Sequence, residues 1–414
     1  MRRLPHDTMT ARERVLATIN GQPTDRVPLF EMIHHKDLLR HVTGKKLTPD
    51  NGLDLLCETL RQCVDVTRGV SAPGKDATWR DDERFLYQSE WWTVWLIERP
   101  FNDVNGACEF MRRNIEKLHT IPKDSMYSFY GQGDVWTHDA ADPNEEYRQL
   151  QEKLENVLLF PSESPVGLDI AYFRLGMELF TYCYAENPAL VSQWLDALNL
   201  HEVERVHRCA NAELAPVALV YTDLADKNGP MFSPDFLRRE FFPRLKRLVD
   251  AWHSHGVKVI YHSDGDYLML LDDYAAAGVD GINPIEKLQR KDNLEESRRG
   301  WPQFTLMGGI DSSNLLPYGS RDEVEAAVKH AFDITKPGGR PLEKYSWSDN
   351  TRLTSSCRAT RYTVMPKALT TVWTPAPARI SPSSGVGSNA LRRMCTGGNE
   401  GADVVMTPTV PTVA

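Results

Sequence analysis

The sequence predicts an α/β fold, a parallel (β/α)8 or TIM barrel, and three observations support this prediction. Residues 257–286 read as a strand, a helix and a second strand, because two apolar runs that end in polar residues flank an amphipathic run. The connection of about a dozen residues suits a right-handed crossover between neighbouring parallel strands. Strand and helix patterns also alternate along most of the chain, and its 414 residues are enough for a barrel with insertions.

Apolar runs predict seven parallel strands, near residues 28–30, 64–67, 157–160, 217–222, 257–262, 279–283 and 304–308. Helical spacing and end signals predict helices at residues 11–20, 53–62, 144–155, 170–184, 188–207, 234–255, 267–277 and 321–335. The eighth strand of the barrel is expected after Pro337, where no strand pattern is evident.

Residues 78–100 have a different pattern, aromatic and alternating, which predicts a β-hairpin inserted in the barrel. The segment contains three closely spaced tryptophans, Trp91, Trp92 and Trp95. We expect them to pack against the barrel rim rather than to bind a ligand.

The chain is expected to divide into a loose leader at residues 1–8, a barrel domain at 9–345 and a tail at 346–414. From Arg340 onward it is rich in Ser, Thr and Pro, and it carries nine Lys or Arg but four Asp or Glu. Such an irregular composition predicts disorder. A frameshift near Arg340 is an alternative explanation, and it would leave a truncated, inactive barrel.

Composition excludes several classes of partner. The net charge of −9 argues against nucleic acid, because phosphate binding needs clustered positive charge. No apolar run is long enough to span a membrane or to form a signal peptide, so a cytoplasmic protein is expected. The seven cysteines include no Cys-x-x-Cys pair, which argues against a zinc ribbon or a disulfide framework. The oligomeric state is left open.

Polar residues gather where the strands of the 257–286 unit end, at His262, Asp264, Asp266, Asn283 and Glu286. The carboxyl ends of barrel strands carry the catalytic residues in this architecture, because variable loops are held there by a rigid frame. A histidine at this rim can bind a metal or donate a proton, since its ordinary pKa is about 6.5. The alternative for Asp266 is that it only caps the helix that follows.

Other strand ends supply further candidates. Asp223, Asp226 and Lys227 follow the strand at 217–222, and Asp311 follows the strand at 304–308. His34 and His35 follow the first strand. Adjacent histidines could bind a ligand, although solvated loop histidines are commoner.

Several of these segments resemble the uroporphyrinogen decarboxylase superfamily of (β/α)8 barrels over residues 9 to about 339. The similar segments are Arg12-Glu-Arg-Val-Leu-Ala, Asp25-Arg-Val-Pro28, Gly229-Pro-Met-Phe-Ser-Pro234, His262-Ser-Asp-Gly265, Ala277-Gly-Val-Asp280, Asn283-Pro284 and Gly308-Gly-Ile-Asp311. The resemblance implies either a porphyrinogen decarboxylase, which needs no cofactor, or a methyltransferase. The methyltransferases exchange methyl groups with a corrinoid carried by a partner protein, usually with zinc.

The sequence departs from both branches. The decarboxylases carry Arg-Gln-Ala-Gly-Arg where this chain has Phe30-Glu-Met-Ile-His-His35, and acid and imidazole cannot replace guanidinium groups that hold carboxylates. Coenzyme M methyltransferases of the family have His-x-Cys where this chain has His262-Ser-Asp264. Oxygen ligands from Asp264, Asp266 or Glu286 would make a harder site than thiolates, but one still compatible with zinc.

The resemblance therefore favours transfer of a methyl group between a small methylated substrate and a corrinoid protein, assisted by zinc. The alternative is a decarboxylase of uroporphyrinogen, as in porphyrin biosynthesis, or of another carboxylic acid. In this interpretation His262, Asp264 and Glu286 are metal ligands and, with Asp223, catalytic residues. The residues expected to bind substrate are His34, His35, Asp226, Lys227, Asp266, Asn283 and Asp311.

Overall fold

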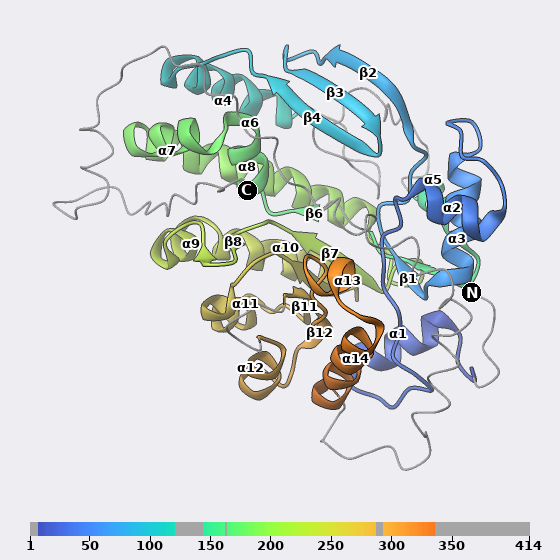
Figure 1. Cartoon of the computed structure of the whole chain (residues 1–414). Coiled ribbons are helices and arrows are strands. Elements are labelled where there is room, and N and C mark those ends of the chain that lie inside the picture. Colours follow the sequence, from blue (N-terminus) through green and yellow to red (C-terminus); the bar gives the residue numbers. More distant parts are fainter. Residues whose placement is uncertain (1–6, 121–143, 162–163, 287–292, 336–414) are drawn as a thin grey trace.

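The computed structural model describes residues 7–120, 144–161, 164–286 and 293–335 (Figure 1). Its main sheet has five parallel strands in the order β12-β11-β10-β7-β6. They are β6 (Ser164–Pro165), β7 (Val217–Tyr221), β10 (Lys258–His262), β11 (Gly281–Ile285) and β12 (Thr305–Gly308). Because neighbours in space follow one another along the chain, this sheet has the topology that a (β/α) barrel requires.

The sheet continues toward the N-terminus through shorter pairings. β1 (Val66–Thr67) pairs in parallel with β5 (Leu158–Leu159), and Phe30 forms a parallel bridge to Val66. The amide of Leu219 in β7 donates a hydrogen bond of 2.9 Å to the carbonyl of Pro161, between β5 and β6. β5 is thus paired with β1, and Pro161 and β6 are bonded to β7.

The described strands thus run in barrel order from Phe30 to β12, which agrees with the parallel α/β prediction. The predicted strand at 28–30 is reduced to the bridge at Phe30, and β6 was not predicted. The eighth strand expected after Pro337, and the tail at 346–414, lie outside the described residues.

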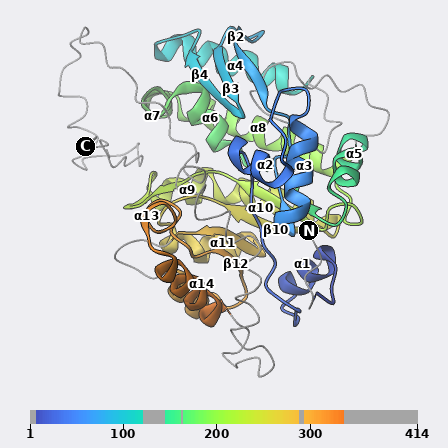
Figure 2. The ribbon, with the colours of Figure 1, turned by 45° about the vertical axis from the view of Figure 1, so that its right-hand side comes forward.

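Helices follow the strands and cover the outside of the sheet (Figures 1 and 2). In the N-terminal half they are α1 (Ala11–Ile19), α2 (Lys36–Thr43), α3 (Gly52–Cys63), α4 (Val104–Leu118), α5 (Glu145–Leu154), α6 (Leu168–Leu175), α7 (Met177–Glu186) and α8 (Pro188–Cys209). In the C-terminal half they are α9 (Pro234–Glu240), α10 (Phe242–Ser254), α11 (Leu271–Ala277), α12 (Asn293–Gly300), α13 (Leu315–Tyr318) and α14 (Arg321–Thr335). No helix in the described part of the chain combines the length and the apolar composition that a bilayer crossing needs.

Three helices predicted as continuous begin or break differently. The predicted helix at 170–184 is divided into α6 and α7 at Gly176, whose φ of 82° is outside the helical region. The predicted helix at 234–255 is divided into α9 and α10 because Pro243 lacks an amide hydrogen and its ring crowds the preceding turn. The predicted helix at 267–277 begins as a 3-10 turn, η1 (Leu268–Leu270).

The Trp-rich segment is a separate antiparallel sheet, as predicted, but it has three strands rather than the two of a hairpin. They are β2 (Gly74–Arg80), β3 (Leu86–Trp91) and β4 (Thr93–Glu98), in that spatial order. This sheet and α4 lie at the end of the molecule away from α12 and α14 in both views (Figures 1 and 2). The Arg99 guanidinium joins the sheet to the barrel helices by donating to the carbonyls of Phe173 and Arg174, both at 2.9 Å.

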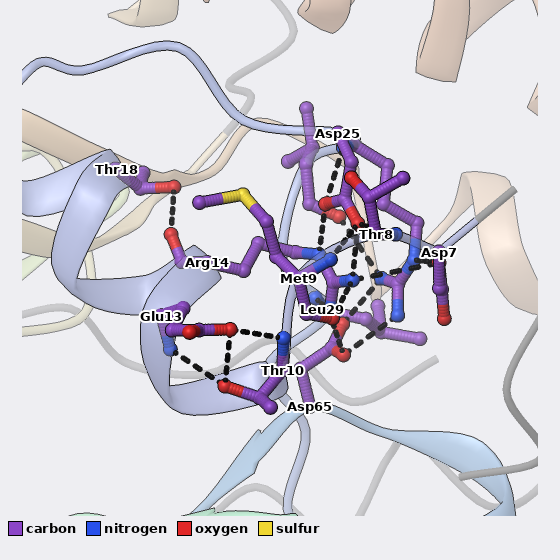
Figure 3. Close-up of polar contacts among 12 residues, drawn as sticks. Asp7, Thr8, Met9, Thr10, Glu13, Arg14, Thr18, Asp25, Leu29 and Asp65 are labelled. Carbon is purple, nitrogen blue, oxygen red and sulfur yellow. Dashed lines mark hydrogen bonds and ion pairs between the residues drawn. The ribbon is translucent and has the colours of Figure 1, made fainter.

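A buried ionic network lies at the amino ends of the first strands (Figure 3). Arg14 of α1 is 1% exposed and donates to Asp25 at 2.6 Å and to Asp65 at 2.8 Å. Arg26 adds an ion pair of 2.5 Å to Asp65 and one of 2.9 Å to Asp7. Asp7 belongs to the predicted loose leader and is instead anchored, whereas residues 1–6 lie outside the described part.

Candidate active site

Three side chains meet at the carboxyl ends of β7 and β10. His262 is the last residue of β10, Asp223 follows β7, and Asp264 lies in the loop after β10. The Nε2 atom of His262 is 3.8 Å from Asp223 Oδ1 and 4.0 Å from Asp264 Oδ1. One ligand atom from each residue lies within 4.8 Å of the other two. This arrangement, called here the rim triad, offers one nitrogen and two oxygen ligands.

Asn283 determines which ring nitrogen of His262 faces the two carboxylates. Residues 262 and 283 are paired in the register of β10 and β11, and His262 Nδ1 is 2.8 Å from Asn283 Oδ1. Because an amide oxygen only accepts hydrogen bonds, Nδ1 carries the proton and Nε2 keeps its lone pair. The lone pair therefore faces the side on which Asp223 and Asp264 lie.

Backbone and hydroxyl contacts hold the triad loops against each other. The amide of Asp264 donates to Asp223 Oδ1 at 3.2 Å, and the hydroxyl of Tyr172 donates to the Asp223 carbonyl at 2.9 Å. The amide of Leu224 donates to the Ser263 hydroxyl at 3.0 Å. The two loops are thus held together by backbone and hydroxyl donors, and Asp223 Oδ1 accepts one of these hydrogen bonds.

The electrostatics of the site disfavour charge on His262 and Asp264. Burial and the nearby Arg68 charge lower the pKa of His262, although the two carboxylates and Asn283 oppose that shift. Burial raises the pKa of Asp264, and Asp223 adds to the rise while His262 and Arg68 oppose it. Burial likewise raises the pKa of Glu286, and the charge of Asp264 raises it further. A cation that joined these groups would replace lost hydration and stabilise the carboxylates in their charged form.

The donor set fits a divalent metal ion. Zinc bonds of about 2.0–2.1 Å in tetrahedral geometry separate their ligands by roughly 3.4 Å, so small side-chain rotations would bring the three atoms into place. The Asn283 contact supplies the orienting hydrogen bond that metal-bound histidines commonly make. The predicted ligand set was His262, Asp264 and Glu286, whereas the group that the structure brings together contains Asp223 in place of Glu286. Glu286 lies close enough for the charge of Asp264 to raise its pKa, and the amide of Gly265 donates a hydrogen bond to Glu286.

Two predicted substrate-binding residues, Asp226 and Lys227, lie in a small antiparallel pair and its turn, β8 (Ala225–Asp226) and β9 (Gly229–Pro230). Lys227 is exposed in its turn, and Asp226 Oδ1 accepts the amide of Asn228 at 2.7 Å. The amide of Asp266 donates to the Asp226 carbonyl at 2.7 Å. Gly265 makes this close approach possible, since a Cβ there would lie 2.5 Å from the carbonyl carbon of Ala225. The structure thus gives Asp226 and Asp266 local structural contacts.

Two further candidates, Asp311 and His35, cap turns and helices. Asp311 Oδ1 accepts the amides of Ser313 and Asn314, both at 2.8 Å, and so caps the turn into α13. His35 is the N-cap of α2, and its Nδ1 accepts the Leu38 amide at 3.2 Å. The contacts of His35 and Asp311 are therefore those of helix and turn caps.

His34 has a different environment, at the junction of the barrel and the inserted sheet. Its ring stacks on Trp92, with centroids 5.1 Å apart and an interplanar angle of 4°. The Trp92 indole donates to the Ser71 carbonyl at 2.9 Å, so this tryptophan packs at the rim as predicted. Burial and the Arg68 charge lower the pKa of His34 to about 4.

Two residues near the site were missed by sequence reasoning. Arg68 directly follows β1, and its charge acts on His34, His262 and Asp264. It therefore contributes a positive charge near the rim triad. Its position at a strand end was the available signal. Asp169 is 7% exposed in the first turn of α6, where Oδ1 accepts the Thr222 hydroxyl at 3.2 Å and burial raises its pKa to about 7. The helical pattern around Asp169 gave no sign of this burial.

The described strands of the main sheet are parallel, and the rim triad lies at the carboxyl edge of this sheet. Residues 167–341 match the protein family described as Uroporphyrinogen decarboxylase (URO-D), a segment that contains the whole triad, Asn283 and Glu286. This match supports membership of the uroporphyrinogen decarboxylase superfamily. No curated protein matches the chain.

Proposed function

We propose that this enzyme transfers a methyl group between a small methylated substrate and a corrinoid carried by a partner protein, with zinc held by the rim triad. The observation that carries the proposal is the orientation of His262. Its Nε2 lone pair faces two carboxylates, and Asn283 fixes that tautomer at 2.8 Å. A porphyrinogen decarboxylase needs no metal, so an assembled ligand set favours the methyltransferase branch of the superfamily.

Each residue of the site has a separate role in the proposed reaction. Asp223, His262 and Asp264 would hold the ion, which supplies Lewis-acid activation of the heteroatom that bears the methyl group. The methyl group leaves as a cation equivalent to the corrinoid, and the electron pair of the broken bond stays on the heteroatom. Glu286 donates the proton that this atom then needs, because its raised pKa favours the protonated carboxyl at a given pH. Asn283 holds the His262 ring during these steps.

The test is methyl transfer to free cob(I)alamin from a panel of methylamines, methyl thioethers and methoxylated aromatic acids, followed by absorbance. The proposal expects turnover with at least one class, a loss of about 100-fold or more in Asp223→Ala, and near-normal rates in Asp37→Ala. Asp37 is an exposed carboxylate in α2 that is suited as a control. No turnover with any donor, together with no bound metal, would instead support an inactive barrel.

A second candidate is a cofactor-free decarboxylase of a carboxylic acid, and Arg68 is the observation that favours it. A guanidinium in the same mouth as His262 could hold a substrate carboxylate while the histidine protonates the carbanion that remains. Turnover of uroporphyrinogen or release of carbon dioxide from small acids, unchanged after metal removal, would establish this activity instead.

A further inference from the structure

Two histidines, one exposed and one half-buried, approach each other far from the rim triad. His207 lies in the last turn of α8, and His255 is the C-cap residue of α10. His207 Nδ1 and His255 Nε2 are 3.2 Å apart, and the rings are inclined by 53°. Among the described residues they are the two histidines whose ring nitrogens form such a contact.

We propose that His207 and His255 form a second metal site, for a divalent zinc, nickel or copper ion. Imidazole nitrogens are preferred ligands of these ions. Two nitrogens bound to one ion at about 2.0–2.1 Å with an angle of roughly 100–110° lie about 3.1–3.4 Å apart, which matches the observed separation. Water would complete the coordination, since His207 is exposed and His255 is only half-buried.

The two helices hold this pair in a fixed geometry. α8 packs against α10, and Asn199 of α8 donates to the Arg244 carbonyl of α10 at 3.1 Å. Arg244 in turn donates to the carbonyl of Ser192 at 2.9 Å. Both histidines also lie at helix C-termini, where the partial negative charge of the last carbonyls favours a cation. The ion would therefore meet ligands that are already positioned.

This site is separate from the rim triad. His255 precedes β10, whereas His262 is the last residue of that strand. A five-residue strand spans on the order of 15 Å, so the pair lies at the amino end of the sheet and the triad at the carboxyl end. The inference consequently does not depend on the proposed methyl transfer.

The alternative is a hydrogen bond between two neutral rings, which also accommodates 3.2 Å. Zinc titration by calorimetry and electron paramagnetic resonance of the copper-loaded chain separate the two, using untagged protein with His262→Ala to remove the triad's histidine. The proposal expects one bound ion with two imidazole nitrogens, and an affinity that falls at least tenfold in His207→Ala and in His255→Ala. His253→Ala is the matched control, because His253 lies in the same turn of α10 but pairs with Asp280 at 2.7 Å.

Binding unchanged in the double variant His207→Ala/His255→Ala, or no ion with two imidazole nitrogens in the parent chain, would overturn the proposal. Thermal unfolding without metal provides the folding control. We expect equal midpoints for the variants and the parent, because His207 is exposed, His255 is only half-buried and neither ring belongs to the hydrophobic core. A metal-induced rise in the midpoint should then be present in the parent and His253→Ala proteins and absent in the other variants.

Discussion

Asn283 of β11 orients the imidazole ring of His262 at the end of β10. It is 7% exposed, and its Oδ1 atom accepts from His262 Nδ1. Removing this acceptor would free the imidazole to rotate and to exchange tautomers, so the Nε2 lone pair would no longer be held toward the carboxylates.

We therefore expect Asn283→Ala to lower zinc affinity by about 10- to 100-fold, in the range seen when an orienting partner of a metal-bound histidine is removed. Competition with a zinc chelator measures the affinity. Asn228→Ala serves as the control, because Asn228 lies in the nearby β8–β9 turn and contacts Asp226 instead of the triad. Equal affinities in the two variants would show that Asn283 does not orient a ligand.

His34 provides a second prediction for a single residue, because burial lowers its pKa to about 4. The unfolded chain binds this proton near pH 6.5, and the folded chain binds it only near pH 4. The folded state is therefore favoured above pH 6.5 and loses stability as the pH falls through this window. NMR titration should show a neutral His34 ring at pH 5, and a ring that is charged at pH 5 would contradict the burial that lowers its pKa.

The sequence could predict that the polar residues of the rim follow strands, but it could not predict which of them lie next to one another. Polar residues after apolar runs identified His262, Asp264 and Asp223 because strand ends can be read from composition. The register between β7 and β10 decides which of these side chains lie close together. This register pairs His262 with Tyr221 and is set by long-range packing. The role of Glu286 as a ligand stays a prediction, and its charge interacts with those of Asp264 and Asp223.

At the scale of elements, the ionic network of Figure 3 joins α1, the loop before Phe30 and the start of β1. Burial alone would raise the pKa of Asp25, but hydrogen bonds from Arg14 and from two backbone amides outweigh it and hold the pKa well below its usual range. The stabilisation from this carboxylate is present above an ordinary carboxyl pKa of about 4 and is lost as the pH falls through the lower folded pKa.

Asp25→Ala should therefore lower the free energy of unfolding by about 3 kcal/mol at pH 7, because it leaves Arg14 buried with one fewer carboxylate. The difference from the parent protein should shrink as the pH is lowered below about 4. Urea unfolding measures both effects. Asp37→Ala removes an exposed pair with Arg40 and should cost less than about 0.5 kcal/mol. Similar losses in the two variants would mean that the network contributes no more than a surface pair.

Strand positions were predicted to within a few residues because short apolar runs bounded by Gly, Pro and Asp are local signals. The breaks at Gly176 and Pro243 were also visible in the sequence, but each lies within an apolar helical pattern that conceals it. β6 could not be found from pattern, since Ser164–Pro165 lacks apolar character and is a strand only because β7 pairs with it.

For the whole molecule, the described structure is a run of parallel strands with a separate antiparallel sheet attached at one end (Figure 2). β7 and β10 have a hydrogen-bonded strand on each side, and the interior residues of both are buried. β2 is an edge strand and most of its residues are exposed. These differences predict different local stabilities.

Hydrogen exchange followed by mass spectrometry should show the slowest exchange in residues 217–221 and 258–262. Residues 74–80 should exchange faster, because opening an exposed edge strand disrupts little of the core. Equal protection in the three segments would indicate that the inserted sheet and the barrel strands unfold as one unit.

The central claim is that the rim triad holds a metal ion, and metal analysis of the purified chain tests it most directly. After incubation with zinc and removal of excess ion, the parent protein should contain one more ion per chain than His262→Ala, while His41→Ala, which changes an exposed histidine of α2, should match the parent. Asp223→Ala should lose the same ion as His262→Ala, since both supply ligands. Equal metal content in the parent, His262→Ala and Asp223→Ala proteins would contradict the claim.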